Sequence, residues 1–128
     1  MINSTIILYF WFKECNPNMW FKKNQEFDNL IKNKFQKTFE YCLKNKINNN
    51  STFRENYLSW IIVLDQFSRN IYRNQIRSFS GDEKALKLSK IAIKKKFLIS
   101  NEDHYNSFFL MPFMHSEKPV SYTHLRAH

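Results

Sequence analysis

Residues 57–70, YLSWIIVLDQFSRN, decide the fold that this 128-residue sequence predicts. The first eight of these residues are apolar on almost every side of a helix, a pattern typical of a helix that its neighbours cover all round. The segment then turns polar at Asp65 and Gln66. Upstream, Thr52 and Glu55 have the spacing of a capping box, in which two side chains satisfy the first amides of a helix. We therefore expect a central helix over residues 52–70.

Other helices should pack against this one. Apolar residues at positions 27, 30, 31, 35, 39, 42 and 43 recur at intervals of three and four, which predicts an amphipathic helix there. Shorter patterns predict helices over residues 6–11, 82–97 and 100–112, the last of them stopped or kinked near Pro112. Ser80 and Glu83 form a second predicted capping box, at the start of the helix over residues 82–97.

Gly81 is the only glycine in the sequence. Phosphate-binding loops, dinucleotide fingerprints and nucleophile elbows each need two or more glycines, so the composition excludes these classes of site. Hairpin-rich β folds also use glycine freely in their turns. With only three prolines as well, the sequence predicts an all-α fold built from antiparallel helical hairpins. No internal repeat recurs at the level of residues.

The formal net charge is +9, from 20 Lys and Arg against 11 Asp and Glu. Asn (15), Lys (15) and Ile (12) all have AT-rich codons, so a biased genome explains much of the lysine content. Arg, the better phosphate ligand, occurs only five times. We therefore expect no specific nucleic-acid partner, and we interpret one lysine stripe as a solvated helix face. That stripe consists of Lys84, Lys87, Lys90 and Lys94.

The cysteines and the apolar runs indicate the cellular compartment of the protein. Cys15 and Cys42 form no CxxC motif and no metal-ligand spacing, so we expect two buried, reduced thiols. No signal-peptide pattern opens the chain, and the apolar runs at 6–12 and 60–64 are far shorter than the roughly 20 residues that cross a bilayer. We expect a cytoplasmic protein without a membrane partner.

One group of candidate functional residues follows the apolar part of the central helix. It consists of Asp65, Gln66, Arg69, Asn70 and Arg73, with Arg77 further on. In the structural interpretation, a buried Asp65–Arg69 pair and a helix-capping arginine stabilise the fold. In the functional interpretation, Arg69 and Arg73 form an anion clamp that Asp65 orients.

A second polar group, His115, Ser116 and Glu117, follows an apolar stretch. The structural interpretation is a hydrogen-bonded core histidine or a helix cap. In the functional interpretation, His115 and Glu117 serve as acid and base, or as two metal ligands. Because zinc needs three or four protein ligands and no third has a recognisable spacing, we predict no metal site and no cofactor, and we assign no catalytic residue.

Six stretches, in order along the chain, resemble a known bacterial family. The opening residues 6–12 (IILYFWF), 20–21 (WF) and 27–28 (FD) resemble the start of the family called domain of unknown function 924. Residues 64–73 (LDQFSRNIYR) are similar to its LDQFPRNxxR segment, with Ser68 where proline is usual and Asn74, just beyond, where glycine is frequent. The similarity continues through residues 78–86 (SFSGDEKAL) and 108–117 (FFLMPFMHSE).

The resemblance implies an all-helical, tetratricopeptide-like fold and carries no catalytic assignment. Family members continue beyond the segment that matches residues 115–117 into further helices. We therefore expect residues 1–118 to be a single α-helical domain, the N-terminal part of a longer one that is incomplete at its C-terminus. Residues 119–128 resemble a translated sequencing adapter, so we expect a non-native tail whose His124 and His128 bind no metal.

Two functional classes fit best, and a third needs a feature that the sequence does not show. The first is a protein- or peptide-binding or structural scaffold, which the tetratricopeptide-like architecture favours by analogy. The second is a small-molecule or anion-binding enzyme, which requires both polar groups to meet at one cavity. The third, a nucleic-acid-binding protein, requires the lysines to form one face with exposed aromatics.

If the family's later helices are lacking, apolar surface of the predicted domain stays uncovered. We therefore expect the 128-residue chain to be marginally stable or to aggregate. Thermal unfolding followed by circular dichroism measures this, and a sharp, reversible transition would contradict the expectation.

Overall fold

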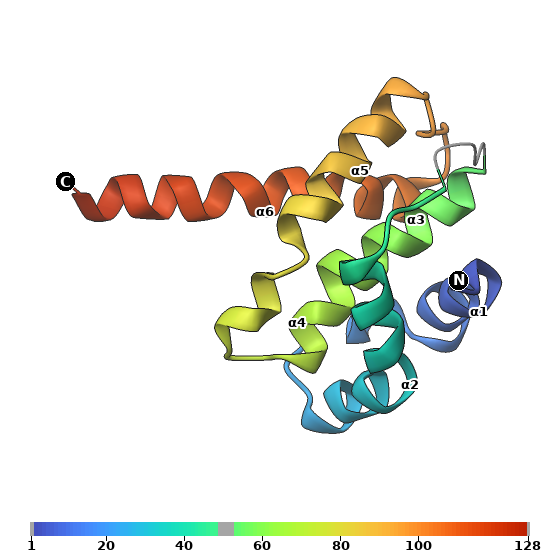
Figure 1. Ribbon diagram of the computed structural model, residues 1–128, viewed down its shortest axis with the longest axis horizontal. Helices are drawn as coiled ribbons and strands as arrows, with labels where there is room; N and C mark the ends of the chain where they lie inside the picture. The colour runs from blue at the N-terminus through green and yellow to red at the C-terminus, as the bar shows by residue number, and fades with distance from the viewer. Residues whose placement is uncertain (1, 49–52, 128) are drawn as a thin grey trace.

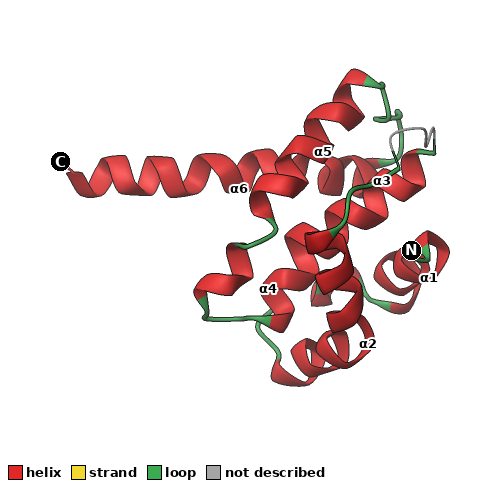
Figure 2. Cartoon of the chain, viewed as in Figure 1, coloured by secondary structure: helices red, strands yellow, loops and turns green. Residues whose placement is uncertain are grey.

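The protein is an assembly of helices joined by short connections (Figures 1 and 2). The computed structural model describes the backbone of residues 2–48 and 53–127, and the side chains of residues 2–48 and 53–116. Within these residues the chain contains helices and turns and no strand, so the all-α prediction is confirmed. None of the described helices is long and apolar enough to cross a membrane.

Six α-helices and four short helical segments follow one another along the described chain. The α-helices are α1 (Ser4–Tyr9), α2 (Gln25–Lys44), α3 (Arg54–Ile61), α4 (Ser68–Ile71), α5 (Asp82–Lys94) and α6 (Asp103–Ala127). Two segments are π-helical, η1 (Phe10–Glu14) and η3 (Ile62–Phe67), and two are 3₁₀-helical, η2 (Pro17–Met19) and η4 (Ile76–Phe79).

The predicted central helix is present as α3, η3 and α4 in direct succession. Every residue from 57 to 68 is buried, because α1, α2, α5 and α6 all pack against parts of this rod. Thr52, half of the predicted capping box, lies outside the described residues. Phe53 stands at the N-cap and makes no side-chain cap bond.

Helix α6 packs against α5 and the central rod and then projects beyond the rest of the molecule (Figure 1). It continues through Pro112, so of the two expected outcomes the stop was wrong, and the kink stays a prediction. The proline ring is buried among neighbouring side chains, and this packing offsets the loss of one backbone hydrogen bond. The expectation that residues 119–128 are a non-native tail stays a prediction.

The core at the N-terminal end is a cluster of aromatic rings. Trp11 is fully buried, stacks on Trp20 at 5.8 Å between ring centroids, and meets Phe67 and Phe108 edge to face. The indole N–H of Trp20 donates to the carbonyl of Trp11 at 2.9 Å. These contacts attach η1 to both the central rod and α6, since aromatic pairs add to the stability that burial of their area supplies.

The lysine stripe on α5 is solvated only in part. Lys87, Lys90 and Lys94 are exposed, as expected. Lys84 instead donates to the carbonyl oxygens of Cys42 at 2.7 Å and Leu43 at 3.1 Å, at the C-terminal end of α2. Burial lowers the pKa of this ammonium group. Lys84 thus neutralises the negative end of the α2 dipole, a tertiary contact that the stripe alone does not indicate.

The two thiols are free and buried, as the sequence predicts. Burial raises the pKa of both Cys15 and Cys42 to about 12. Burial thus favours the neutral thiol over the thiolate, the form that attacks electrophiles and binds metals.

Gly81 allows α5 to begin directly against the π-helical segment η3. A Cβ atom at Gly81 would lie 2.3 Å from the carbonyl oxygen of Leu64 and 3.0 Å from its carbonyl carbon. Its φ of −94° suits any residue, so glycine is needed here for space. The predicted capping box is wrong: Ser80 donates to the carbonyl of Arg77 at 2.7 Å, and Gly81 is the N-cap without a side-chain bond.

Gly81→Ala should destabilise the fold by about 1–3 kcal/mol, because the added methyl group must displace the backbone of a buried helix. Urea unfolding measures the change in the free energy of unfolding. Ser80→Ala, next to it on the exposed side, is the matched control and should stay within about 0.5 kcal/mol of the original protein. Equal effects of the two substitutions would contradict the steric explanation.

Candidate functional site

The polar residues after the apolar part of the central rod begin with a carboxylate that has no exposed surface. Asp65 lies in the π-helical segment η3 and is 0% exposed. His115 of α6 places Nδ1 2.8 Å from Oδ1 of Asp65, and Gln66 donates its amide N–H to Oδ2 at 2.8 Å. A buried charge is tolerated only when it is paired and hydrogen-bonded, so these partners are necessary for the fold.

The backbone of the π-helical turn has side-chain partners as well. Ser68 donates its hydroxyl to the carbonyl of Leu64 at 2.8 Å, and Arg69 donates to the carbonyl of Asp65 at 2.6 Å. In an ordinary α-helix these carbonyls would bind the amide four residues later. The side chains of the motif therefore help to stabilise a wide turn of a kind that is frequent at functional sites.

Arg69 connects the central rod to α5. Its guanidinium binds both carboxylate oxygens of Asp82, at 2.9 and 3.0 Å, and lies 5.5 Å from the ring centre of Phe79. The distance from Arg69 to the carboxylate of Asp65 is longer, 3.6 Å. Asp82 is in the first turn of α5, where a negative charge also suits the helix dipole.

Arg73 connects the central rod to α2. It donates from Nε at 2.6 Å and from Nη2 at 3.0 Å to Asp28, in the first turn of α2, and Asn70 donates to the same carboxylate at 2.9 Å. The hydrogen bond to Asp28 raises the pKa of the Arg73 guanidinium, although burial opposes the shift. Both arginines are thus held by forked contacts.

The structure divides the predicted site residues into two networks. Asp65, Gln66, Arg69 and His115 form one network, and Asn70 and Arg73 form the other on Asp28. Asp65 contacts Arg69, as both interpretations expected, but Arg73 binds Asp28, so the expectation that Asp65 also orients Arg73 was wrong. The backbone of Glu117 belongs to α6, but its side chain lies outside the described residues.

Sequence reasoning missed Asp28 and Asp82 as members of the site. Two signals were present: both lie in stretches that resemble the family, and both stand in the first turn of a helix, which the helix dipole explains without a partner. Their pairing with arginines 45 and 13 residues away in the chain depends on how the helices pack.

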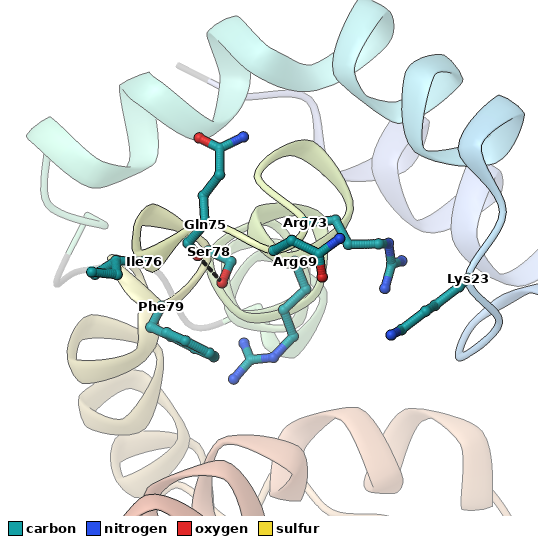
Figure 3. A pocket seen from close by; sticks show the side chains of 8 residues that line it. Lys23, Arg69, Arg73, Gln75, Ile76, Ser78 and Phe79 are labelled. Carbon is teal, nitrogen blue, oxygen red and sulfur yellow. Dashed lines mark hydrogen bonds between the residues drawn. The ribbon is translucent and has the colours of Figure 1, made fainter.

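Both arginines border a surface pocket of about 390 Å³ (Figure 3). In Figure 3 the charged ends of Lys23 and Arg73 lie near each other, and the guanidinium of Arg69 lies further along the pocket, near Phe79. His115 is not among the described residues that line it. We call this space the basic pocket, and its described lining consists of Lys23, Arg69, Arg73, Asn74, Gln75, Ile76, Ser78 and Phe79.

Asn74 shapes the wall of the basic pocket through its backbone. Its φ is 67°, in the left-handed region that glycine and asparagine adopt most readily. The family resemblance places a frequent glycine at this position, and the backbone conformation supplies the physical reason. The turn then leads into η4, which carries Ile76 and Phe79.

No group of three or more His, Cys, Asp or Glu that could hold a metal ion occurs within residues 2–48 and 53–116. The described groups at the site are paired carboxylates and arginines, one imidazole and the amide groups between them.

Paired charged and polar side chains connect the central rod to α2, α5 and α6. Together these elements form an all-helical domain with a polar network at its centre. The chain belongs to a family described as bacterial proteins of unknown function, DUF924, whose sequence profile matches residues 7–127. The resemblance seen in the sequence is confirmed. A search of curated proteins found no match.

The chain is also similar to a solved structure, a protein of unknown function from Agrobacterium tumefaciens. The two share 27% sequence identity with a TM-score of 0.75. The similarity covers 88% of this chain and 63% of the Agrobacterium chain, so this chain spans less than two thirds of that protein's length.

His115→Ala should lower the free energy of unfolding by about 1.5–3 kcal/mol, because Asp65 then loses a hydrogen bond to a buried charge. In an Asp65→Asn background the same substitution should cost clearly less, since the charge is already gone. His104→Ala on the same helix is the control, because His104 is exposed and its ring meets Trp20 edge to face. Additive effects of the Asp65 and His115 substitutions would contradict the pairing.

Proposed function

We propose that this chain is a helical binding protein that holds an acidic segment of a protein or peptide partner in the basic pocket. The observation that carries the proposal is the meeting of Lys23, Arg69 and Arg73 at one pocket with two exposed apolar side chains beside them. Ile76 is 90% exposed and Phe79 is 57% exposed. Exposed apolar side chains next to arginines are typical of surfaces that bind other proteins.

The arginines suit binding because their positions are set before a ligand arrives. Asp82 holds Arg69 and Asp28 holds Arg73 through forked contacts, so neither side chain must be immobilised when a ligand binds. Pre-organised groups lose less conformational entropy on association, which favours affinity. Among the described residues no group pairs with the Lys23 ammonium or with Nη1 of Arg73, so both have donors available.

The enzyme hypothesis has one observation in its favour. The 2.8 Å contact between Asp65 and Nδ1 of His115 is the arrangement in which a carboxylate orients an imidazole for acid–base chemistry. The hypothesis also requires the imidazole and the arginines to share a cavity, and His115 is not among the described residues that line the basic pocket. The binding function therefore has the stronger support.

A cytoplasmic location and a tetratricopeptide-like arrangement belong to the same proposal. Two reduced, buried cysteines support a reducing compartment. Stacked helical hairpins in such folds form concave surfaces for peptides, and the family resemblance is the support for that arrangement here.

Fluorescence anisotropy with labelled peptides tests the binding function. A peptide that carries a carboxylate and an apolar residue should bind, and Lys23→Gln should weaken binding about tenfold, since it removes a cation with no structural partner. Lys90→Gln, an exposed lysine on α5, is the matched control for the same change in net charge. Added salt should weaken binding as well.

Two results would count against the proposal. One is the absence of binding by any acidic peptide at about millimolar concentration, the weak end of specific affinities. The other is an equal loss for Lys23→Gln and Lys90→Gln, which would indicate attraction to the overall positive charge of the protein.

A further inference from the structure

We infer that the basic pocket binds the C-terminal carboxylate of a peptide whose last residue has an apolar side chain. The inference rests on the proposed function and narrows it to one chemical class of ligand. Three properties of the pocket support it: its charge, the position of its open donors, and its size together with its apolar wall.

The charge of the basic pocket suits an anion with a single negative charge. Lys23, Arg69 and Arg73 supply three positive charges, and two carboxylates, Asp82 and Asp28, already bind the arginines. At most one positive charge is then unbalanced. A phosphate group carries about −1.5 to −2 charges at neutral pH and would leave negative charge uncompensated. A carboxylate matches the charge of the pocket.

The open donors lie on one side of the pocket. The Nε and Nη2 edge of Arg73 is occupied by Asp28, which leaves Nη1 directed away from that contact. Figure 3 shows the ammonium end of Lys23 and the guanidinium of Arg73 on the same side of the pocket. Two donors from different elements can bind the two oxygens of one carboxylate, and such capture of a chain end is a recurring mode of peptide recognition.

The size of the pocket favours a chain end. Ligand pockets span about 300–1,000 Å³, and the basic pocket, at about 390 Å³, is near the small end of that range. It has room for one terminal residue, whose carboxylate and side chain leave the same Cα and can reach the basic and apolar walls together. Ile76 and Phe79 both line the pocket from η4 and offer apolar surface to the last side chain.

Four peptides derived from one parent sequence test the inference by fluorescence anisotropy on the full chain. The first ends in leucine with a free carboxylate, and the second has an amidated end. The third is amidated and carries an internal glutamate, and the fourth is amidated and carries an internal phosphoserine. The free acid should bind at least tenfold more tightly than each of the other three.

Substitutions of the apolar residues that line the pocket are the second part of the test. Ile76→Ser should weaken binding of the leucine-ended free acid about fivefold and have little effect on a peptide that ends in glycine. Ile6→Ser is the matched control, because Ile6 is an exposed isoleucine on α1, outside the described lining of the pocket. N-acetyl-leucine, added as a competitor, shows whether the pocket prefers a peptide or binds any small carboxylic acid equally well.

The possible results separate this inference from the proposed function. Equal binding of the free acid and the internal-glutamate peptide, with loss on Lys23→Gln, would overturn the inference and leave the proposed function intact. Tighter binding of the phosphopeptide would overturn it also, as would N-acetyl-leucine binding as tightly as the peptide. If no peptide binds, the proposed function itself fails.

Discussion

The fully buried carboxylate of Asp65 is the constraint on which the rest of the structure depends. A charge in this position must have partners, and His115 on α6 and Gln66 on the central rod provide them. Arg69 lies close to the same carboxylate while its forked contact with Asp82 fixes the start of α5. The contact of Asp65 with His115 thus links α6 to the central rod, and the Arg69–Asp82 pair links α5 to it, because a buried charge that loses a partner is strongly destabilising.

The same arginines that stabilise the fold also border the basic pocket. Asp82 and Asp28 take one edge of each guanidinium, so the groups that face the ligand are rigid and their excess charge is small. Each arginine therefore belongs both to a structural ion pair and to the wall of the pocket. For this reason the sequence motif was compatible with a structural ion pair and with an anion clamp. The contacts within the fold reduce the charge of the pocket, and that reduction points to a carboxylate as the ligand.

Local patterns predicted the helices well and their ends poorly. The run of apolar residues from 57 to 64 predicted a central helix, and the structure buries all of them. The capping box predicted at Ser80 and Glu83 provides no cap, and α6 continues through Pro112. A periodic pattern draws on many residues, so one exception does not remove it. A helix cap or a helix end depends on a few contacts, which packing against other helices can replace.

The sequence by itself determined the all-α class, the central helix, the family and the residues of the polar motif, because these depend on periodicity and residue type. Tertiary structure alone decided which carboxylate each arginine binds, that Gly81 is needed where a Cβ atom would collide with Leu64, and that Lys23 shares a pocket with Arg69 and Arg73. These are contacts between segments far apart in the chain. Their partners are set by the packing of the helices, which no local pattern encodes.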